Sequence, residues 1–383
     1  MPNTDSLIVT SAARPSSAYE WDQAVLRSRD AWLYHLSDIA SLDFWSLWSA
    51  PLFVECHNDS TLIGGALLTH GTTKWNSTSL GPLGRRSART FVGNLLAGPF
   101  VVDGLSKSLT ERVRHLLVEE LLGRARALGC EELWLGDAPQ SQATISRTSP
   151  VNRYVLSSNW ENCQRYHYFV DLRTDEGTRW DNLKQERRTS IRRARNSGVT
   201  VLTGSELNNP EDHFAALMTG LDPVRALTPE KLRSIWDALY ADARHGQTFF
   251  AIEDGSPQAF ACVPAMGRVA NYHLGARSAT ATSGAHALAL WEAMCWAASQ
   301  GYEWFDVGRA VTEIEGSEQD QREFGISRFK EGFGGQIFAV DLAVRHDLRP
   351  FRGRTLDLVW AVARSVERRV REARRHDMEP NRF

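Results

Sequence analysis

The chain has 383 residues, of which 42% are hydrophobic and 23% are charged, and its formal net charge is −2 at pH 7. A chain of this length and composition is globular and has two domains or two fused halves. The small net charge excludes a whole-protein attraction to nucleic acid or anionic lipid, so any polyanion site has to be a local patch.

The five cysteines are widely scattered and form neither a CxxC pair nor a Cys/His cluster. This spacing argues against a disulfide framework and structural zinc, and we predict no metal site and a reduced, cytoplasmic setting. The first fifteen residues read as a loose arm without the apolar core of a signal peptide. No run reaches the roughly 18 apolar residues of a membrane-spanning helix, which leaves only peripheral membrane contact open.

Strand and helix signals alternate along the first part of the chain. Two strand-like runs, Leu52–Cys56 and Leu62–Thr69, flank the polar turn HNDS. Apolar residues at helical spacing predict an amphipathic helix over Thr110–Leu128, ended by Gly129. A short strand is predicted at Glu132–Leu135.

The second part of the chain repeats this order of elements. The predicted strands and the helix among them are Thr248–Ile252, Ala259–Ala265, Val269–Leu274, the helix Ala285–Ser299, Trp304–Val307 and Ile337–Val344. The stretch ARALGCEELWLG also aligns with AASQGYEWFDVG at a constant offset of 172 residues. The shared order and the aligned stretch favour an internal duplication.

We therefore predict an α/β (α+β) fold built from two tandem halves, each a mixed sheet flanked by helices. The halves are expected over residues 16–160 and 165–345. A basic helix over residues 350–383 follows, with an apolar stripe and many arginines on its other faces. That helix either packs on the protein with one solvent-exposed face, or binds RNA or an anionic membrane surface.

The stretch RFKEGFGG contains Lys330, one of only five lysines in the chain. A lysine held against the rings of Phe329 and Phe333 can direct its ammonium at a phosphate or a developing oxyanion. Gly332 and Gly334 allow the backbone to approach a ligand closely. The alternative is that the two phenylalanines belong to the core, Lys330 is solvated and the glycines form a β-bulge.

A basic helix is predicted within LKQERRTSIRRARNSGVTV, where Arg188, Arg192 and Arg195 share one face. Such a face suits the phosphates of tRNA or of a nucleotide-linked acceptor, although a solvated helix face is the alternative. Asp306 stands in a predicted strand before the RFKEGFGG stretch. It is expected either to orient an amine or accept its proton, or to pair with an arginine such as Arg309.

Four stretches in this order resemble the FemABX-type transferases and their BioF2-like and GNAT-superfamily relatives, which include the peptidoglycan-bridge aminoacyl transferases. They are LKQERRTSIRRARNSGVTV, YHLGA, GYEWFDVGR and RFKEGFGG. The resemblance covers roughly residues 165–345 and implies two tandem GNAT-like domains. It also implies transfer of an aminoacyl or acyl group from an activated ester or thioester to an amine. The preferred co-substrate is aminoacyl-tRNA, without a bound cofactor, and the acceptor is a cell-wall precursor or a small amine or peptide.

By the same resemblance, Lys330 is near the reacting ester, with Phe329 beside it. Asp306, from its place in the predicted strand, is the third catalytic candidate. The candidate substrate- and phosphate-binding residues are Arg188, Arg192, Arg195, Arg309, Tyr272, Gly332, Phe333 and Gly334.

The sequence departs from typical GNAT acetyltransferases at the loop that holds the CoA pyrophosphate. In its place RSATATSGAHAL has one arginine and one Gly-Ala at the wrong spacing. Acyl-CoA is therefore the alternative donor, on the same fold. A non-catalytic relative that binds RNA or another polyanion is the second alternative.

Overall fold

The structure is a computed structural model of the whole chain. It describes residues 7–42, 51–76, 85–92, 98–130, 132–148, 160–219, 228–241, 244–311, 318–345 and 348. The predicted basic helix over residues 350–383 lies outside the described residues.

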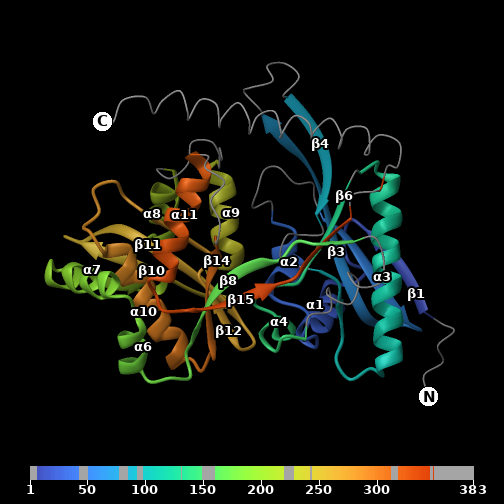
Figure 1. The fold of residues 1–383 in the computed structure, drawn as a ribbon, viewed down its shortest axis with the longest axis horizontal. Helices are drawn as coiled ribbons and strands as arrows, with labels where there is room; N and C mark the ends of the chain where they lie inside the picture. Colours follow the sequence, from blue (N-terminus) through green and yellow to red (C-terminus); the bar gives the residue numbers. More distant parts are fainter. Residues whose placement is uncertain are drawn as a thin grey trace, which may run out of the picture.

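Two mixed sheets lie side by side and form the centres of the two halves (Figure 1). The first half contains β1 (Leu7–Ala12), α1 (Ala18–Leu26), η2 (Leu33–His35), α2 (Ser37–Ala40), β2 (Leu52–Asn58), β3 (Thr61–Asn76), β4 (Arg85–Val92), β5 (Phe100–Val101), α3 (Lys107–Ala127), β6 (Glu132–Gly136), α4 (Gln142–Ile145) and β7 (Glu161–Asn162). Its sheet has the strand order β1-β2-β3-β4-β6-β16-β7, and β5 pairs with β3.

The second half begins with β8 (Arg165–Asp171), α6 (Glu176–Asn182), α7 (Gln185–Asn196), β9 (Thr200–Thr203), η4 (Gly204–Glu206), α8 (Pro210–Thr219) and α9 (Pro229–Leu239). It continues with β10 (Gly246–Glu253), β11 (Ser256–Met266), β12 (Val269–Asn271), β13 (Leu274–Arg277), α10 (Ala285–Ser299), β14 (Trp304–Ala310), α11 (Glu318–Glu331), β15 (Gln336–Val340) and β16 (Leu342–Arg345). Its sheet has the order β15-β8-β14-β12-β11-β10-β9, and β13 pairs with β11.

Local signals account for the long helices that cover these sheets. The hydroxyl of Ser106 caps α3 by accepting a hydrogen bond from the amide of Leu109 at 3.3 Å. Gly129, at φ +75°, ends that helix. In the second half, Gly301 at φ +84° follows α10 in the same way. A left-handed residue after the last turn is the usual helix stop, and glycine adopts it without strain.

The internal duplication is visible in the pairing of the strands. In the first sheet β4 and β6 are parallel, and α3 lies between them in the chain. In the second sheet β12 and β14 are parallel, and α10 lies between them. Each half therefore has an antiparallel hairpin, a strand, a crossover helix and a parallel strand, as the repeated sequence order predicts.

The second half also contributes a strand to the sheet of the first half. The chain passes from the first sheet to the second between β7 and β8, and β8 pairs antiparallel with β14. The strand after β15 is β16, which pairs antiparallel with β6 of the first sheet. Residues 342–345, which we assigned to the second half, therefore extend the first sheet. β8 and β15 run through the middle of the molecule between the halves (Figure 1).

Three predicted boundaries are wrong. The strand predicted over Ile337–Val344 is broken at Asp341 into β15 and β16, which pair in different sheets. The arm expected at the N-terminus contains β1, whose residues alternate in exposure because it is an edge strand paired with β2. The strand predicted over Val269–Leu274 is interrupted after Asn271. Before the interruption β12 pairs with both β11 and β14, and after it β13 pairs with β11. This interruption opens the second sheet next to β14.

Candidate active site

A fully buried carboxylate, that of Asp306 on β14, lies where the two halves meet. Its Oδ1 accepts a hydrogen bond from the Gly308 amide at 2.7 Å, and its Oδ2 accepts one from the Asn271 side chain at 3.0 Å. The side-chain amide of Gln140 also donates to Oδ2. His167 Nδ1 lies 3.1 Å from both oxygens. The acceptor capacity of this carboxylate is therefore filled by protein groups.

The donors to Asp306 come from four different segments. Gln140 lies in the turn after β6 in the first half, and His167 lies on β8 of the second half. Asn271 is the last residue of β12, where the second sheet opens. The carboxylate thus connects the first half, β8 and the opening in the second sheet at one point.

Lys330 extends from α11 toward this point. A Cβ atom added at Gly308 would lie 2.6 Å from the Lys330 Nζ, so the side chain points inward over β14. Burial lowers the pKa of Lys330, the negative charge of Asp306 opposes that shift, and the positive charge of Arg309 adds to it. The ammonium is held here over Gly308, at the part of β14 that lies beyond its pairing with β12.

The cation over the two phenylalanine rings is Arg187, not Lys330 as we predicted. Its guanidinium carbon lies 4.3 Å from the ring centre of Phe329 and 5.2 Å from that of Phe333. Arg187 Nη2 also donates to the carbonyl of Phe329 at 3.1 Å. Phe329 stacks on His286 at 5.3 Å on its other side. The rings therefore fix α11 against α7 and α10, and this fixation positions Lys330.

The glycines of the RFKEGFGG stretch serve close packing. A Cβ atom at Gly332 would lie 2.9 Å from the guanidinium of Arg187, and its carbonyl accepts from the Lys184 amide at 3.0 Å. Gly334 has φ +78°, and a Cβ there would lie 2.2 Å from the carbonyl oxygen of Asn182. The segment after α11 thus packs tightly against the start of α7, instead of forming the β-bulge that was the alternative.

Tyr272 lies at the interruption between β12 and β13. Its amide donates to the backbone carbonyl of Asp306 at 2.8 Å, and its hydroxyl lies 2.9 Å from His286 Nε2. Burial, together with the charges of Arg277 and Arg187, lowers the pKa of His286 to about 4. Burial likewise raises the pKa of the Tyr272 hydroxyl. Both groups are therefore neutral at pH 7.

The remaining predicted arginines contact other protein groups. Arg188 donates to the Leu183 carbonyl at 2.8 Å, and the guanidinium carbon of Arg192 lies 5.3 Å from a ring centre of Trp180. Arg195 forms an ion pair with Glu292 at 2.7 Å. These contacts are with α6, α10 and the start of α7. The guanidinium of Arg309, predicted as a partner of Asp306, instead pairs with Glu323 at 3.5 Å.

Sequence reasoning missed five residues of this site. They are Gln140, His167, Asn271, Arg187 and His286. Only Arg187 had a local signal, because it lies in the predicted basic helix. Among the described residues, no cluster of histidine, cysteine or acidic side chains has metal-binding geometry. Within the same residues, no helix combines the length and apolarity that membrane crossing requires.

Residues 183–331 match the family model described as acetyltransferase (GNAT) domain. The fold is similar to the crystal structure of FemX, with a TM-score of 0.60 and 14% identity over 87% of this chain and 96% of that chain. It is also similar to L-PGS from Bacillus licheniformis (TM-score 0.55, 13% identity, 90% of this chain and 96% of that chain). A tandem GNAT protein from the clavulanic acid biosynthesis pathway matches with a TM-score of 0.52 and 11% identity, over 88% of this chain and 98% of that chain.

A comparison with curated protein sequences gave no match. The family model covers the segment that contains Asp306, Arg187 and Lys330, and the structural matches extend over both halves. Residues 183–331 therefore match an acetyltransferase (GNAT) domain, and the chain as a whole has a fold similar to that of FemX.

Proposed function

We propose that the chain transfers an aminoacyl group from aminoacyl-tRNA to an amine acceptor and forms an amide bond. The acceptor is a cell-wall precursor or a small amine or peptide. The observation that carries the proposal is the inward ammonium of Lys330, held over Gly308 at the open edge of β14. The similarity of the fold to FemX supports the same reading.

In this reaction the nitrogen of the acceptor attacks the ester carbonyl carbon, and an oxyanion develops on the carbonyl oxygen. The ammonium of Lys330 stabilises that charge, as hydrogen-bond donors do in other acyl transfers. The bond from carbon to the ribose oxygen then breaks, and the proton lost by the amine goes to the leaving oxygen. Asp306 does not act as the base, because its oxygens already accept hydrogen bonds from four protein groups. The acceptor therefore enters as a neutral amine.

The start of α10 argues against CoA as the donor. Helix N-termini bind pyrophosphate when their backbone amides are open to it. Gly284 precedes α10, and a Cβ atom there would lie 2.1 Å from the carbonyl oxygen of Ser190 on α7. A carbonyl oxygen this close to the helix end repels an anion and occupies space that a pyrophosphate needs. The residues present do not fit the CoA pyrophosphate at this helix.

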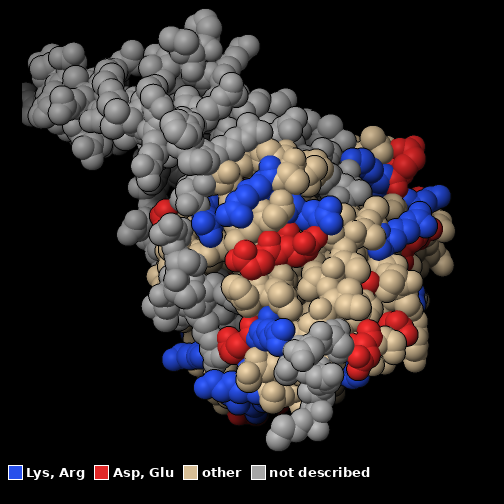
Figure 2. Space-filling view, turned by 90° about the vertical axis from the view of Figure 1, so that its right-hand side faces the viewer, with Lys and Arg blue, Asp and Glu red and all other residues tan. Residues whose placement is uncertain are grey.

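An acyl-CoA-dependent N-acyltransferase is the alternative function. The description of the matching family model as an acetyltransferase domain favours it. The second alternative is a relative that binds a polyanion without catalysis. Figure 2 shows the face over α3 and β1, where basic and acidic side chains lie next to each other on the described surface. This face has no extended field of one sign and does not favour polyanion binding.

The test is turnover of purified protein with a mixture of aminoacyl-tRNAs and candidate amines, measured as amide product. We expect product that disappears after RNase treatment. Lys330→Ala is expected to lower kcat by about 100- to 1,000-fold, the usual effect of losing one oxyanion donor. Lys231→Ala on α9 is the matched control and should retain full activity. Equal turnover with and without RNase would exclude tRNA as the donor, and turnover with acyl-CoA alone would establish the alternative.

A further inference from the structure

Two buried polar atoms, one in a side chain bonded to Asp306 and one in a side chain within reach of its charge, have no hydrogen-bond partner in the described part of the chain. They are the hydroxyl oxygen of Tyr34 and the Oε1 of Gln140, in side chains that belong to residues only 5% and 3% exposed. More than about 90% of buried polar groups in proteins are hydrogen-bonded. Leaving one unpaired costs about 1–3 kcal/mol. Two such atoms, both in side chains that the charge of Asp306 reaches, point to a polar guest.

The orientation of the Gln140 amide is fixed by Asp306. Its Nε2 donates to the Asp306 carboxylate, so the amide cannot turn over without placing Oε1 against a negatively charged oxygen. Oε1 is therefore held as a free acceptor on the other side of the planar amide. Gln140 thus brings an acceptor oxygen from the first half to the site. This oxygen suits a ligand that donates hydrogen bonds.

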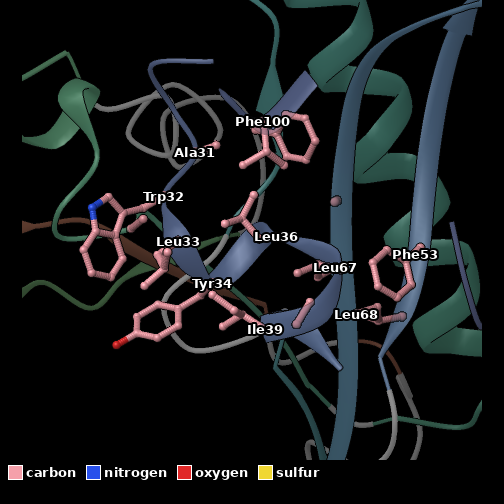
Figure 3. Packing of buried hydrophobic residues seen from close by; sticks show 14 of the residues in the cluster. Ala31, Trp32, Leu33, Tyr34, Leu36, Ile39, Phe53, Leu67, Leu68 and Phe100 are labelled. Carbon is pink, nitrogen blue, oxygen red and sulfur yellow. The ribbon is translucent and has the colours of Figure 1, made fainter. Parts of the chain in front are cut away.

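Tyr34 is a residue of η2, and its side chain lies within reach of the Asp306 charge. Figure 3 shows Tyr34 and Trp32 on the side of their segment that faces away from Leu67 and Leu68 on β3. The Tyr34 ring centre lies 5.5 Å from that of His273, two residues after Asn271 in the chain. Burial raises the pKa of Tyr34 well above its ordinary value, and the charge of Asp306 raises it further. The hydroxyl is thus neutral and lies within the field of the carboxylate.

We propose that Tyr34 and Gln140 form a subsite for a primary ammonium or amine group beside Asp306. An ammonium can donate to both free oxygens, while Asp306 supplies compensating negative charge and no further hydrogen bond. An anion would instead face the Gln140 oxygen and the carboxylate, which both repel it. The inference rests on the proposed function, in which two groups have this chemistry: the α-ammonium of the aminoacyl donor and the amine of the acceptor.

Binding of L-alaninamide to the full-length protein, measured by calorimetry, tests the subsite directly. The control ligand is N-acetyl-L-alaninamide, whose nitrogen is acylated and cannot be charged. We expect binding of the first ligand only. Tyr34→Phe should weaken it about tenfold or more, because a hydrogen bond to a charged group is lost while the ring is kept. Tyr302→Phe, at the end of α10, should bind as the unchanged protein does.

Equal binding of the two ligands, or an unchanged affinity in Tyr34→Phe, would overturn the proposal and leave a buried water as the guest. The comparison of ligands needs no variant, so it stands even if Tyr34→Phe folds poorly. Inhibition kinetics separate the two sources of the amine. Competition of L-alaninamide with aminoacyl-tRNA assigns the subsite to the donor, competition with the acceptor assigns it to the acceptor, and competition with neither refutes it. Because binding is measured without turnover, failure of the tRNA assay alone would overturn the proposed function and not the subsite.

Discussion

Replacing Gly308 by alanine is the sharpest perturbation of the proposed oxyanion donor. The added Cβ would lie 2.6 Å from Nζ of Lys330 and 3.3 Å from its Cε, both well inside ordinary contact distance. The flexible lysine end must move by roughly 1 Å, and a displacement of that size can lower a rate about 100-fold. Gly308 also has φ +100°, a conformation that costs an alanine about 1–2 kcal/mol. We expect Gly308→Ala to lose both stability and kcat.

Gly301→Ala separates these two effects. Gly301 has φ +84°, and a Cβ atom there would meet nothing within 4 Å. This variant should lose a similar amount of stability without touching Lys330. The assay is kcat per folded molecule, with the folded fraction taken from urea denaturation under the same conditions. If both variants lose the same activity per folded molecule, the contact between Gly308 and Lys330 has no role in the reaction.

Three further predictions concern the charges around the site. Asp306→Asn removes the charge that opposes the lowering of the Lys330 pKa, so the alkaline limb of the pH–rate profile should move to lower pH. Arg187→Met should destabilise the fold by about 1–2 kcal/mol in urea denaturation, because it loses its contacts with two aromatic rings. Burial lowers the pKa values of His273 and His286 to about 4, so below pH 6.5 the unfolded chain binds protons that the folded chain does not. The free energy of unfolding should therefore fall by about 2 kcal/mol per histidine between pH 7 and pH 5.

The elements that the sequence predicts well are those with local causes. Ala285–Ser299 is a helix with the predicted boundaries, because Gly284 and Gly301 bracket a run of good helix formers. The strands around β10 and β11 were predicted to within a few residues, because their apolar runs flank the turn at Asp254 and Gly255. In these cases the residues that end a helix or strand lie next to it in the sequence.

The hydrogen-bond partners of Asp306 could not be predicted, because most of them are far from it in the sequence. Its partners Gln140 and His167 lie 166 and 139 residues away in the chain. Asn271 lies 35 residues away, on the strand that runs parallel to β14. From the sequence, a strand-end aspartate pairs most simply with a nearby arginine, and the tertiary fold overrides that expectation.

The basic helix shows a different limit of sequence reasoning. Helical spacing groups Arg188, Arg192 and Arg195 on one face of α7, but spacing alone does not say which face is covered. The buried residues of α7 are Ile191 and Ala194, and Arg187 reaches the rings at the end of α11. The arginine that reaches the site is therefore Arg187, which does not belong to the face formed by Arg188, Arg192 and Arg195.

The donors to the Asp306 carboxylate show why the site needs both halves. Residues 165–345 contain Lys330, Asp306 and His167, and thus most of the chemistry. They lack Gln140, which fills one of the hydrogen bonds to the Asp306 carboxylate. They would also leave β16 without its partner β6, and a strand edge without a partner favours association with other chains. The first half therefore completes the polar network beside Lys330 as well as supporting the fold, because Gln140 donates a hydrogen bond to the Asp306 carboxylate.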